Sequence, residues 1–127
     1  MIPGYEDITC EVNEEEIEMA KEIARAFSVK YIGKENAVSG AKIIASYKKN
    51  RGYNLNDGRL RKIIQYIRLN CLTARPLLAS AKGYYIARND EELKKWLITM
   101  DKRIRQTQYT RDCVKFFSIA GNQYKEI

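Results

Sequence analysis

The sequence predicts a mainly α-helical protein with one small β-hairpin and a long helix near its C-terminal end. Apolar residues recur at helical spacing in several stretches. Two short strand-like runs flank a turn that contains glycine. The 127 residues, of which 45% are hydrophobic, suffice for one compact domain with an extension.

The first helix is expected after an irregular arm at residues 1–12, which show no periodicity. Asn13 and Glu16 have the spacing of a capping box, and apolar residues follow at helical spacing. Three glutamates share one face of this helix: Glu15, Glu18 and Glu22. We interpret them as complementing the helix dipole rather than as metal ligands, and no metal site is predicted.

The next two helices are predicted to form a helix-turn-helix. A short extended segment at Ala37 and Val38 precedes Ser39, which is expected to cap the second helix. Four residues of that helix are expected to point inward: Ala41, Ile44, Ala45 and Tyr47. The helix should end near Gly52, and Asn56 or Asp57 should cap the third helix. Two short helices joined by a turn are the helix-turn-helix arrangement.

The third predicted helix has one apolar face and one basic face. Large aliphatic residues occupy positions i, i+3, i+4 and i+7: Leu60, Ile63, Ile64 and Ile67. That face is expected to be buried. Polar residues occupy and flank the opposite face: Arg59, Arg61, Lys62, Gln65, Tyr66 and Arg68. Such a face can bind an anion, but cationic residues also fill ordinary solvated surfaces.

A β-hairpin is predicted after the third helix. The runs 76–79 and 84–87 are strand-like, and Gly83 between them can supply the positive φ of a tight turn. Lys82 would then lie at the tip of the hairpin. Two arginines flank its base: Arg75 and Arg88. A hairpin that follows a helix-turn-helix is a wing, so a winged helix-turn-helix is the predicted architecture.

The last predicted helix starts at a second capping-box pattern, formed by Asn89 and Glu92. It carries a heptad-like apolar seam: Leu93, Leu97, Met100 and Ile104. Two interpretations stay open, because the seam can pack on the first helix of the same chain or pair two chains. The expected organisation is a winged helix-turn-helix domain at 13–88, a helical extension at 89–119 and a flexible tail at 120–127.

Composition narrows the possible functions. Residues 1–30 contain eight acidic and three basic side chains and therefore carry a net charge of −5. Because the net charge of the whole chain is +7, the remaining residues carry a net charge of +12. That excess suits a polyanionic partner. The sequence has no histidine, which excludes His-dependent triads and His-ligated metals. The three cysteines are far apart and are expected to be reduced thiols, buried or idle.

The same composition predicts a soluble, cytoplasmic protein. Acidic residues stand where a signal peptide needs a basic start, and no apolar run approaches the roughly 20 residues that span a bilayer. No cofactor and no membrane partner are expected.

Residues 39–87 resemble small winged helix-turn-helix proteins that are common in bacteriophages and mobile elements. The matching helix residues are Leu60, Arg61, Ile64, Ile67 and Arg68. The matching hairpin residues are Ser80, Lys82, Gly83, Tyr84, Tyr85, Ile86 and Ala87. The resemblance covers roughly half the chain and the charged helix after it. Proteins of this kind bind DNA in the regulation or replication of their element, and the resemblance implies the same role here.

The sequence therefore favours a non-enzymatic protein that binds double-stranded DNA, with or without sequence specificity. The expected DNA contacts are Arg59, Arg61, Lys62, Gln65, Tyr66, Arg68, Arg75, Lys82 and Arg88. If about six of them neutralise phosphates, affinity should fall by about three powers of ten between about 50 and 200 mM salt. The alternative is a protein-interaction module that assembles a phage or replication complex through its C-terminal helix, as a homodimer or with another protein. A metal-dependent nuclease would need carboxylates clustered in the basic part of the chain, where the acidic triplet is better explained as a helix start.

Overall fold

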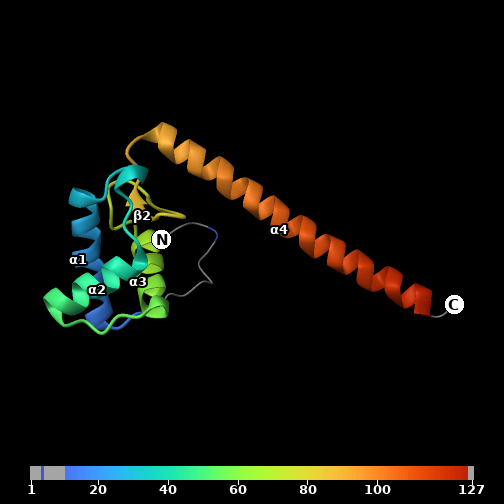
Figure 1. Ribbon diagram of the computed structural model, residues 1–127, viewed down its shortest axis with the longest axis horizontal. Helices are drawn as coiled ribbons and strands as arrows, with labels where there is room; N and C mark the ends of the chain where they lie inside the picture. Colours follow the sequence, from blue (N-terminus) through green and yellow to red (C-terminus); the bar gives the residue numbers. More distant parts are fainter. Residues whose placement is uncertain (1–3, 5–10, 126–127) are drawn as a thin grey trace. The chain divides into compact units, whose positions relative to one another are not determined.

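The computed structural model describes Gly4 and residues 11–125, with 121–125 as backbone only. Its elements are α1 (Glu14–Lys30), the 3-10 turn η1 (Lys34–Asn36), α2 (Gly40–Arg51), α3 (Asp57–Leu69), β1 (Leu77–Ser80), β2 (Gly83–Ile86) and α4 (Asp90–Lys125). The prediction of a mainly helical protein with a small antiparallel hairpin and a long C-terminal helix is confirmed (Figure 1). The chain divides into two compact units, 1–92 and 93–127. Most of the predicted arm and the end of the predicted tail lie outside the described residues.

Each helix start has the cap that the sequence predicts. The Asn13 side chain accepts from the Glu16 amide at 2.8 Å, and the Glu16 carboxylate accepts from the Asn13 amide at 3.0 Å, which completes the capping box. Ser39 caps α2, Asn56 caps α3, and the Asn89 side chain accepts from the Glu92 amide. These side chains satisfy amides that a helix leaves unpaired in its first turn.

The core lies where α1 and α3 pack against each other, with the hairpin and α2 closing it (Figure 1). Helices α1, α2 and α3, both strands and Val38 contribute residues to it: Met19, Ala20, Ile23, Phe27, Val38, Ile43, Leu60, Ile63, Ile64, Ile67, Leu77 and Ile86. Burial of this apolar surface is the main source of the unit's stability.

The prediction for the inward face of α2 is partly wrong. Ala41 and Ala45 are exposed, whereas Ile43 is 4% exposed. Ile44 and Tyr47 are half-buried, as predicted. Each alanine buries little apolar area, so the larger isoleucine decides which side of the helix turns to the core.

Strand β2 is paired on both edges. It pairs antiparallel with β1, from Leu77 opposite Ile86 to Ser80 opposite Gly83. On its other edge, the Val38 amide donates to the Tyr84 carbonyl at 2.9 Å, and the Tyr84 amide donates to the Val38 carbonyl at 2.8 Å. The extended segment predicted at Val38 is therefore confirmed, and it fixes the hairpin to the connection between α1 and α2.

Gly83 is required at the end of the hairpin turn. Its φ is +131°, in the region that the sequence predicts for it. A Cβ atom at this position would also overlap the carbonyl group of Val38. The pairing of β2 with Val38 thus depends on the absence of a side chain here, which the sequence pattern alone does not indicate.

Helix α4 continues to Lys125, beyond the expected end of the extension at 119. The apolar seam weakens at Thr107. The Thr107 hydroxyl donates to the Arg103 carbonyl at 2.9 Å, and the Thr110 hydroxyl donates to the Gln106 carbonyl at 3.0 Å. These threonines satisfy their hydroxyls within the helix, which continues although the seam is lost. Among the described residues, no helix combines the length and apolarity needed to cross a membrane.

Candidate nucleic-acid interface

Helix α3 has the two faces that the sequence predicts. Its four aliphatic residues are at most 2% exposed: Leu60, Ile63, Ile64 and Ile67. They pack on α1 and α2 and so fix the rotation of α3 about its axis. The polar residues between them are consequently turned toward the surface.

Three of the predicted DNA contacts are exposed and make no side-chain hydrogen bond or ion pair with the described part of the chain. Arg61 and Gln65 lie one turn apart on α3. Lys82 lies in the two-residue turn between β1 and β2. These three side chains keep their hydrogen-bond donors available to an external partner.

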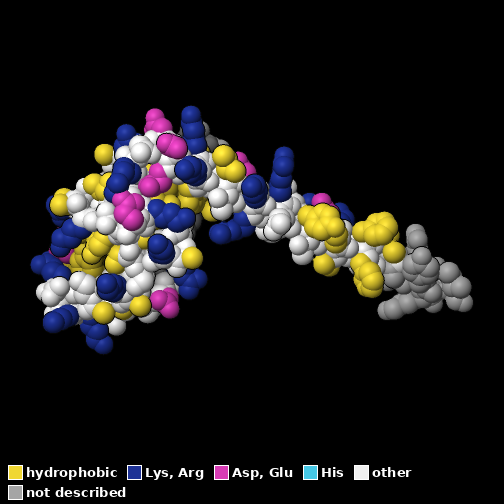
Figure 2. All heavy atoms as spheres, turned by 45° about the horizontal axis from the view of Figure 1, so that its top comes forward, with side chains coloured by type: hydrophobic (Ala, Val, Ile, Leu, Met, Phe, Trp, Pro, Cys, Tyr) yellow, Lys and Arg dark blue, Asp and Glu magenta, His cyan; other side chains and the backbone are white. Residues whose placement is uncertain are grey.

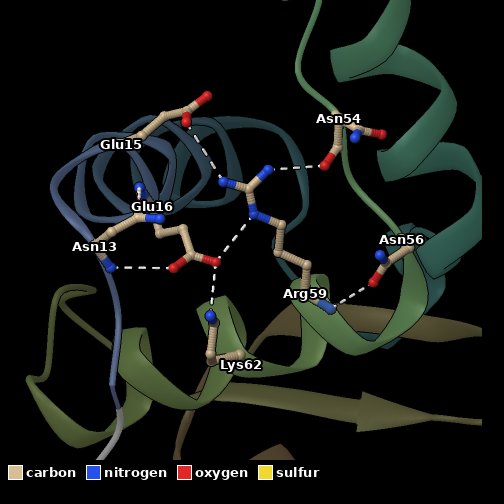
Figure 3. Close-up of polar contacts among 7 residues, drawn as sticks. All are labelled: Asn13, Glu15, Glu16, Asn54, Asn56, Arg59 and Lys62. Atoms are coloured by element: carbon tan, nitrogen blue, oxygen red, sulfur yellow. Dashed lines mark hydrogen bonds and ion pairs between the residues drawn. The ribbon is translucent and has the colours of Figure 1, made fainter.

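Arg59 and Lys62 instead contact a buried carboxylate on α1 (Figure 3). Glu16 is 2% exposed. Its Oε2 atom lies 3.0 Å from Arg59 Nε and 2.9 Å from Lys62 Nζ. Arg59 Nη1 also donates to the Asn54 carbonyl at 2.8 Å. The side chains of Arg59 and Lys62 are therefore part of the contact between α1 and α3.

The charge state of Glu16 follows from these neighbours. Burial alone would raise the pKa of its carboxyl group. The Lys62 ammonium, the Asn13 amide and the Arg59 guanidinium outweigh that effect and lower the pKa from 4.5 to about 2. Glu16 is thus an ionised, fully hydrogen-bonded group between two helices at neutral pH.

The sequence contains a signal for Glu16 that the prediction did not use. Glu16 lies four residues before Ala20 and seven before Ile23, on the apolar stripe of α1. A carboxylate on a buried stripe requires a cationic partner from another element. The capping box uses only one oxygen of the Glu16 carboxylate, so the second oxygen needs another partner.

The remaining predicted contacts also have partners within the chain. Arg68 Nε donates to the Leu77 carbonyl at 2.8 Å, and burial against β1 lowers the pKa of its guanidinium. Arg75 pairs with Asp90 at 3.5 Å. The last two predicted DNA contacts have internal partners as well: Arg88 forms an ion pair with Glu35, and Tyr66 packs against the hydrophobic core. These residues attach the hairpin and the start of α4 to the rest of the unit.

Neither the cysteines nor the carboxylates form a metal site among the described residues. Cys71 and Cys113 are exposed, so they are not the buried thiols that the sequence suggested as one possibility. Cys10 lies outside the described residues.

The predicted seam of α4 is incompletely covered. Leu97 is 45% and Ile104 is 49% exposed, while Leu93 and Met100 are half-buried. Further along α4, five large hydrophobic residues with described side chains are more than half exposed: Tyr109, Val114, Phe116, Phe117 and Ile119. Figure 2 shows hydrophobic side chains gathered on this part of the helix. Exposed apolar surface of this kind is typical of an interaction site.

Comparison with known proteins finds no matching family model, no matching curated protein and no matching solved structure.

Proposed function

We propose that the chain binds double-stranded DNA without catalysing a reaction, through a winged helix-turn-helix formed by α2, α3 and the hairpin. The order of the elements supports this proposal, because a short helix, a turn, a second helix and a hairpin follow one another directly. The resemblance to phage and mobile-element proteins adds a biological setting, in which the chain regulates transcription or assists replication of such an element.

The observation that carries the proposal is the pair of available donors on α3. Arg61 and Gln65 are exposed one turn apart, on the side opposite the buried aliphatic residues. An arginine can donate two hydrogen bonds to guanine O6 and N7, and a glutamine can form two with adenine N6 and N7. The 13-residue helix is about 20 Å long. Its diameter, about 10 to 12 Å with side chains, fits the major groove, which is about 12 Å wide.

Lys82 supplies the second part of the proposed surface. It lies in the turn of the hairpin, and the pairing of Tyr84 with Val38 keeps that turn beside the start of α2. In this proposal the Lys82 ammonium binds a phosphate, which positions the protein without reading sequence. Lys62, whose side chain is 41% exposed, can add a weaker phosphate contact while it remains paired with Glu16.

The test is a titration of a fluorescent duplex with the full chain, followed by anisotropy. Arg61→Ala combined with Gln65→Ala should weaken binding about thirty-fold or more, because each of the two contacts to a base edge contributes about 1 to 3 kcal/mol. The matched control removes one arginine and one amide elsewhere, as Arg25→Ala with Asn50→Ala, and should bind like the wild type. Equal losses in both variants would overturn the proposal.

A second candidate function is protein interaction through α4. The exposed apolar residues of the seam and of the C-terminal part of the helix favour it. In this alternative the winged unit assembles a phage or replication complex, and α4 pairs with a second copy or with another protein. It predicts that the Arg61→Ala with Gln65→Ala variant binds duplex DNA like the wild type, whereas Leu97→Asp with Ile104→Asp abolishes assembly.

A further inference from the structure

A groove of about 640 Å³ lies between α1 and α2. Its lining contains none of the nine predicted DNA contacts. The lining residues are Glu22, Arg25, Ala26, Phe27, Lys30, Tyr31, Val38, Lys42, Ile43, Ser46, Tyr47, Asn50 and Arg51. The proposed DNA-binding function leaves this groove without a role.

The interior of the groove is apolar and aromatic. Phe27, Val38 and Ile43 form its base and are themselves buried. Tyr31 packs on Phe27 with ring centroids 5.1 Å apart. Tyr47 stacks on Tyr53 at 6.1 Å. Aromatic side chains with packed neighbours make a preformed surface for a flat apolar group.

The rim of the groove is cationic. Four basic side chains and one carboxylate occur among the described residues that line it. The carboxylate of Glu22 is already paired, because it lies 2.6 Å from Arg51. Three cations remain, and none makes a side-chain hydrogen bond or ion pair with a described residue: Arg25, Lys30 and Lys42. The rim thus has an excess of positive charge from both helices.

We infer that this groove binds a small organic anion that carries an aromatic ring. The three available cations would hold the negative group, and the tyrosines and the apolar base would receive the ring. The volume falls within the roughly 300–1,000 Å³ of small-molecule sites. Burial in the groove raises the pKa of the Tyr47 phenol first of all, and the Glu22 carboxylate adds to the effect. Tyr47 therefore remains a neutral hydroxyl beside the anion.

The test uses the aromatic sulfonate 1-anilinonaphthalene-8-sulfonate as the probe and the full chain. We expect saturable binding with a rise in probe fluorescence, and amide chemical-shift changes confined to residues of α1, α2 and the segment between them. Arg25→Glu with Lys42→Glu should weaken binding by about ten-fold or more, which corresponds to about 1.4 kcal/mol. The matched control, Lys48→Glu with Lys49→Glu, makes the same charge change on α2 outside the groove and should keep the wild-type affinity.

Several outcomes would overturn the inference. These are the absence of saturable binding, equal weakening in both charge-reversal variants, or shift changes spread over α3 and the hairpin. Displacement of the probe by inorganic phosphate at matched ionic strength would show that the ring contributes nothing, and would also overturn it. Arg61→Ala with Gln65→Ala should leave probe binding unchanged, so failure of the DNA proposal and failure of this inference give different results. Circular dichroism of each variant verifies that it is folded.

Discussion

The carboxylate of Glu16 on α1 accepts a hydrogen bond from Arg59 Nε on α3 at 3.0 Å. This contact joins the acidic start of the chain to its basic helix. Lys62 approaches the same carboxylate oxygen at 2.9 Å, so two of the cations that the sequence predicts as DNA contacts help to fix the position of α3 (Figure 3). The exposed face of α3 is oriented by this cluster together with the aliphatic core.

Glu16→Gln should destabilise the protein by about 3 kcal/mol, because it leaves two partly buried cations without their anion. Chemical denaturation at neutral pH measures the change. Glu15→Gln is the control, since the Glu15 side chain is 62% exposed and lies 3.5 Å from Arg59. That exposed pair should contribute less than about 1 kcal/mol. Similar losses in the two variants would contradict the assignment of Glu16 as the central partner.

The same carboxylate predicts how stability depends on pH. Its pKa is lowered from 4.5 to about 2 in the folded protein, so the folded state binds the proton less readily than the unfolded chain. The stabilisation is complete above pH 4.5 and is lost as the pH falls toward 2. It amounts to about 3 kcal/mol. Urea unfolding at several pH values should show this loss in the wild type and a smaller loss in Glu16→Gln.

Gly83→Ala should destabilise the hairpin and with it the domain, by about 2 kcal/mol or more. The added methyl group would overlap the Val38 carbonyl, and the φ of +131° is unfavourable for alanine. Gly58→Ala is the matched control, because a Cβ there comes no closer than 3.5 Å to its neighbours at the start of α3. The control should be neutral or stabilising by up to about 1 kcal/mol. Thermal unfolding of both variants decides between these outcomes.

The exposed seam of α4 predicts self-association of the full chain. Leu97→Asp with Ile104→Asp should shift the protein to the monomer in sedimentation equilibrium, because both side chains are about half exposed and form the apolar seam. Lys94→Asp with Lys95→Asp changes the same helix outside the seam and should retain the wild-type mass. A wild-type chain that is monomeric at high concentration would remove the basis for pairing two copies.

The sequence predicts most of the fold because its local signals agree with one another. The four aliphatic residues of α3 fit only one rotation of that helix, and the caps at Asn13, Ser39 and Asn56 mark the helix starts. The failures occur where signals are weak or distant. In α2, Ala41 and Ala45 are predicted to point inward, but Ile43 is the buried residue because it can bury more apolar area than an alanine. The end of α4 is predicted too early, because apolar residues do not recur at regular helical spacing in its last turns.

The candidate site is less predictable than the fold. A helical pattern shows that Arg59 and Lys62 are polar and near the surface, but it cannot show that both meet Glu16, more than forty residues earlier in the chain. Pairing between distant elements is decided by packing. The internal partners of the arginines around the hairpin are equally hidden from a helical pattern, since Arg68 Nε donates to a backbone carbonyl of β1.

The central claim is that Arg61, Gln65 and Lys82 form a surface that binds duplex DNA. Its most direct test is the salt dependence of duplex binding by the wild type and by single alanine variants of these residues. Affinity should fall with rising salt in the wild type, because Lys82 and Lys62 neutralise phosphates. Lys82→Ala should reduce the slope of log affinity against log salt by about one, and Gln65→Ala should lower affinity with the slope unchanged. A wild-type slope near zero, or identical behaviour of the variants and the wild type, would contradict the claim.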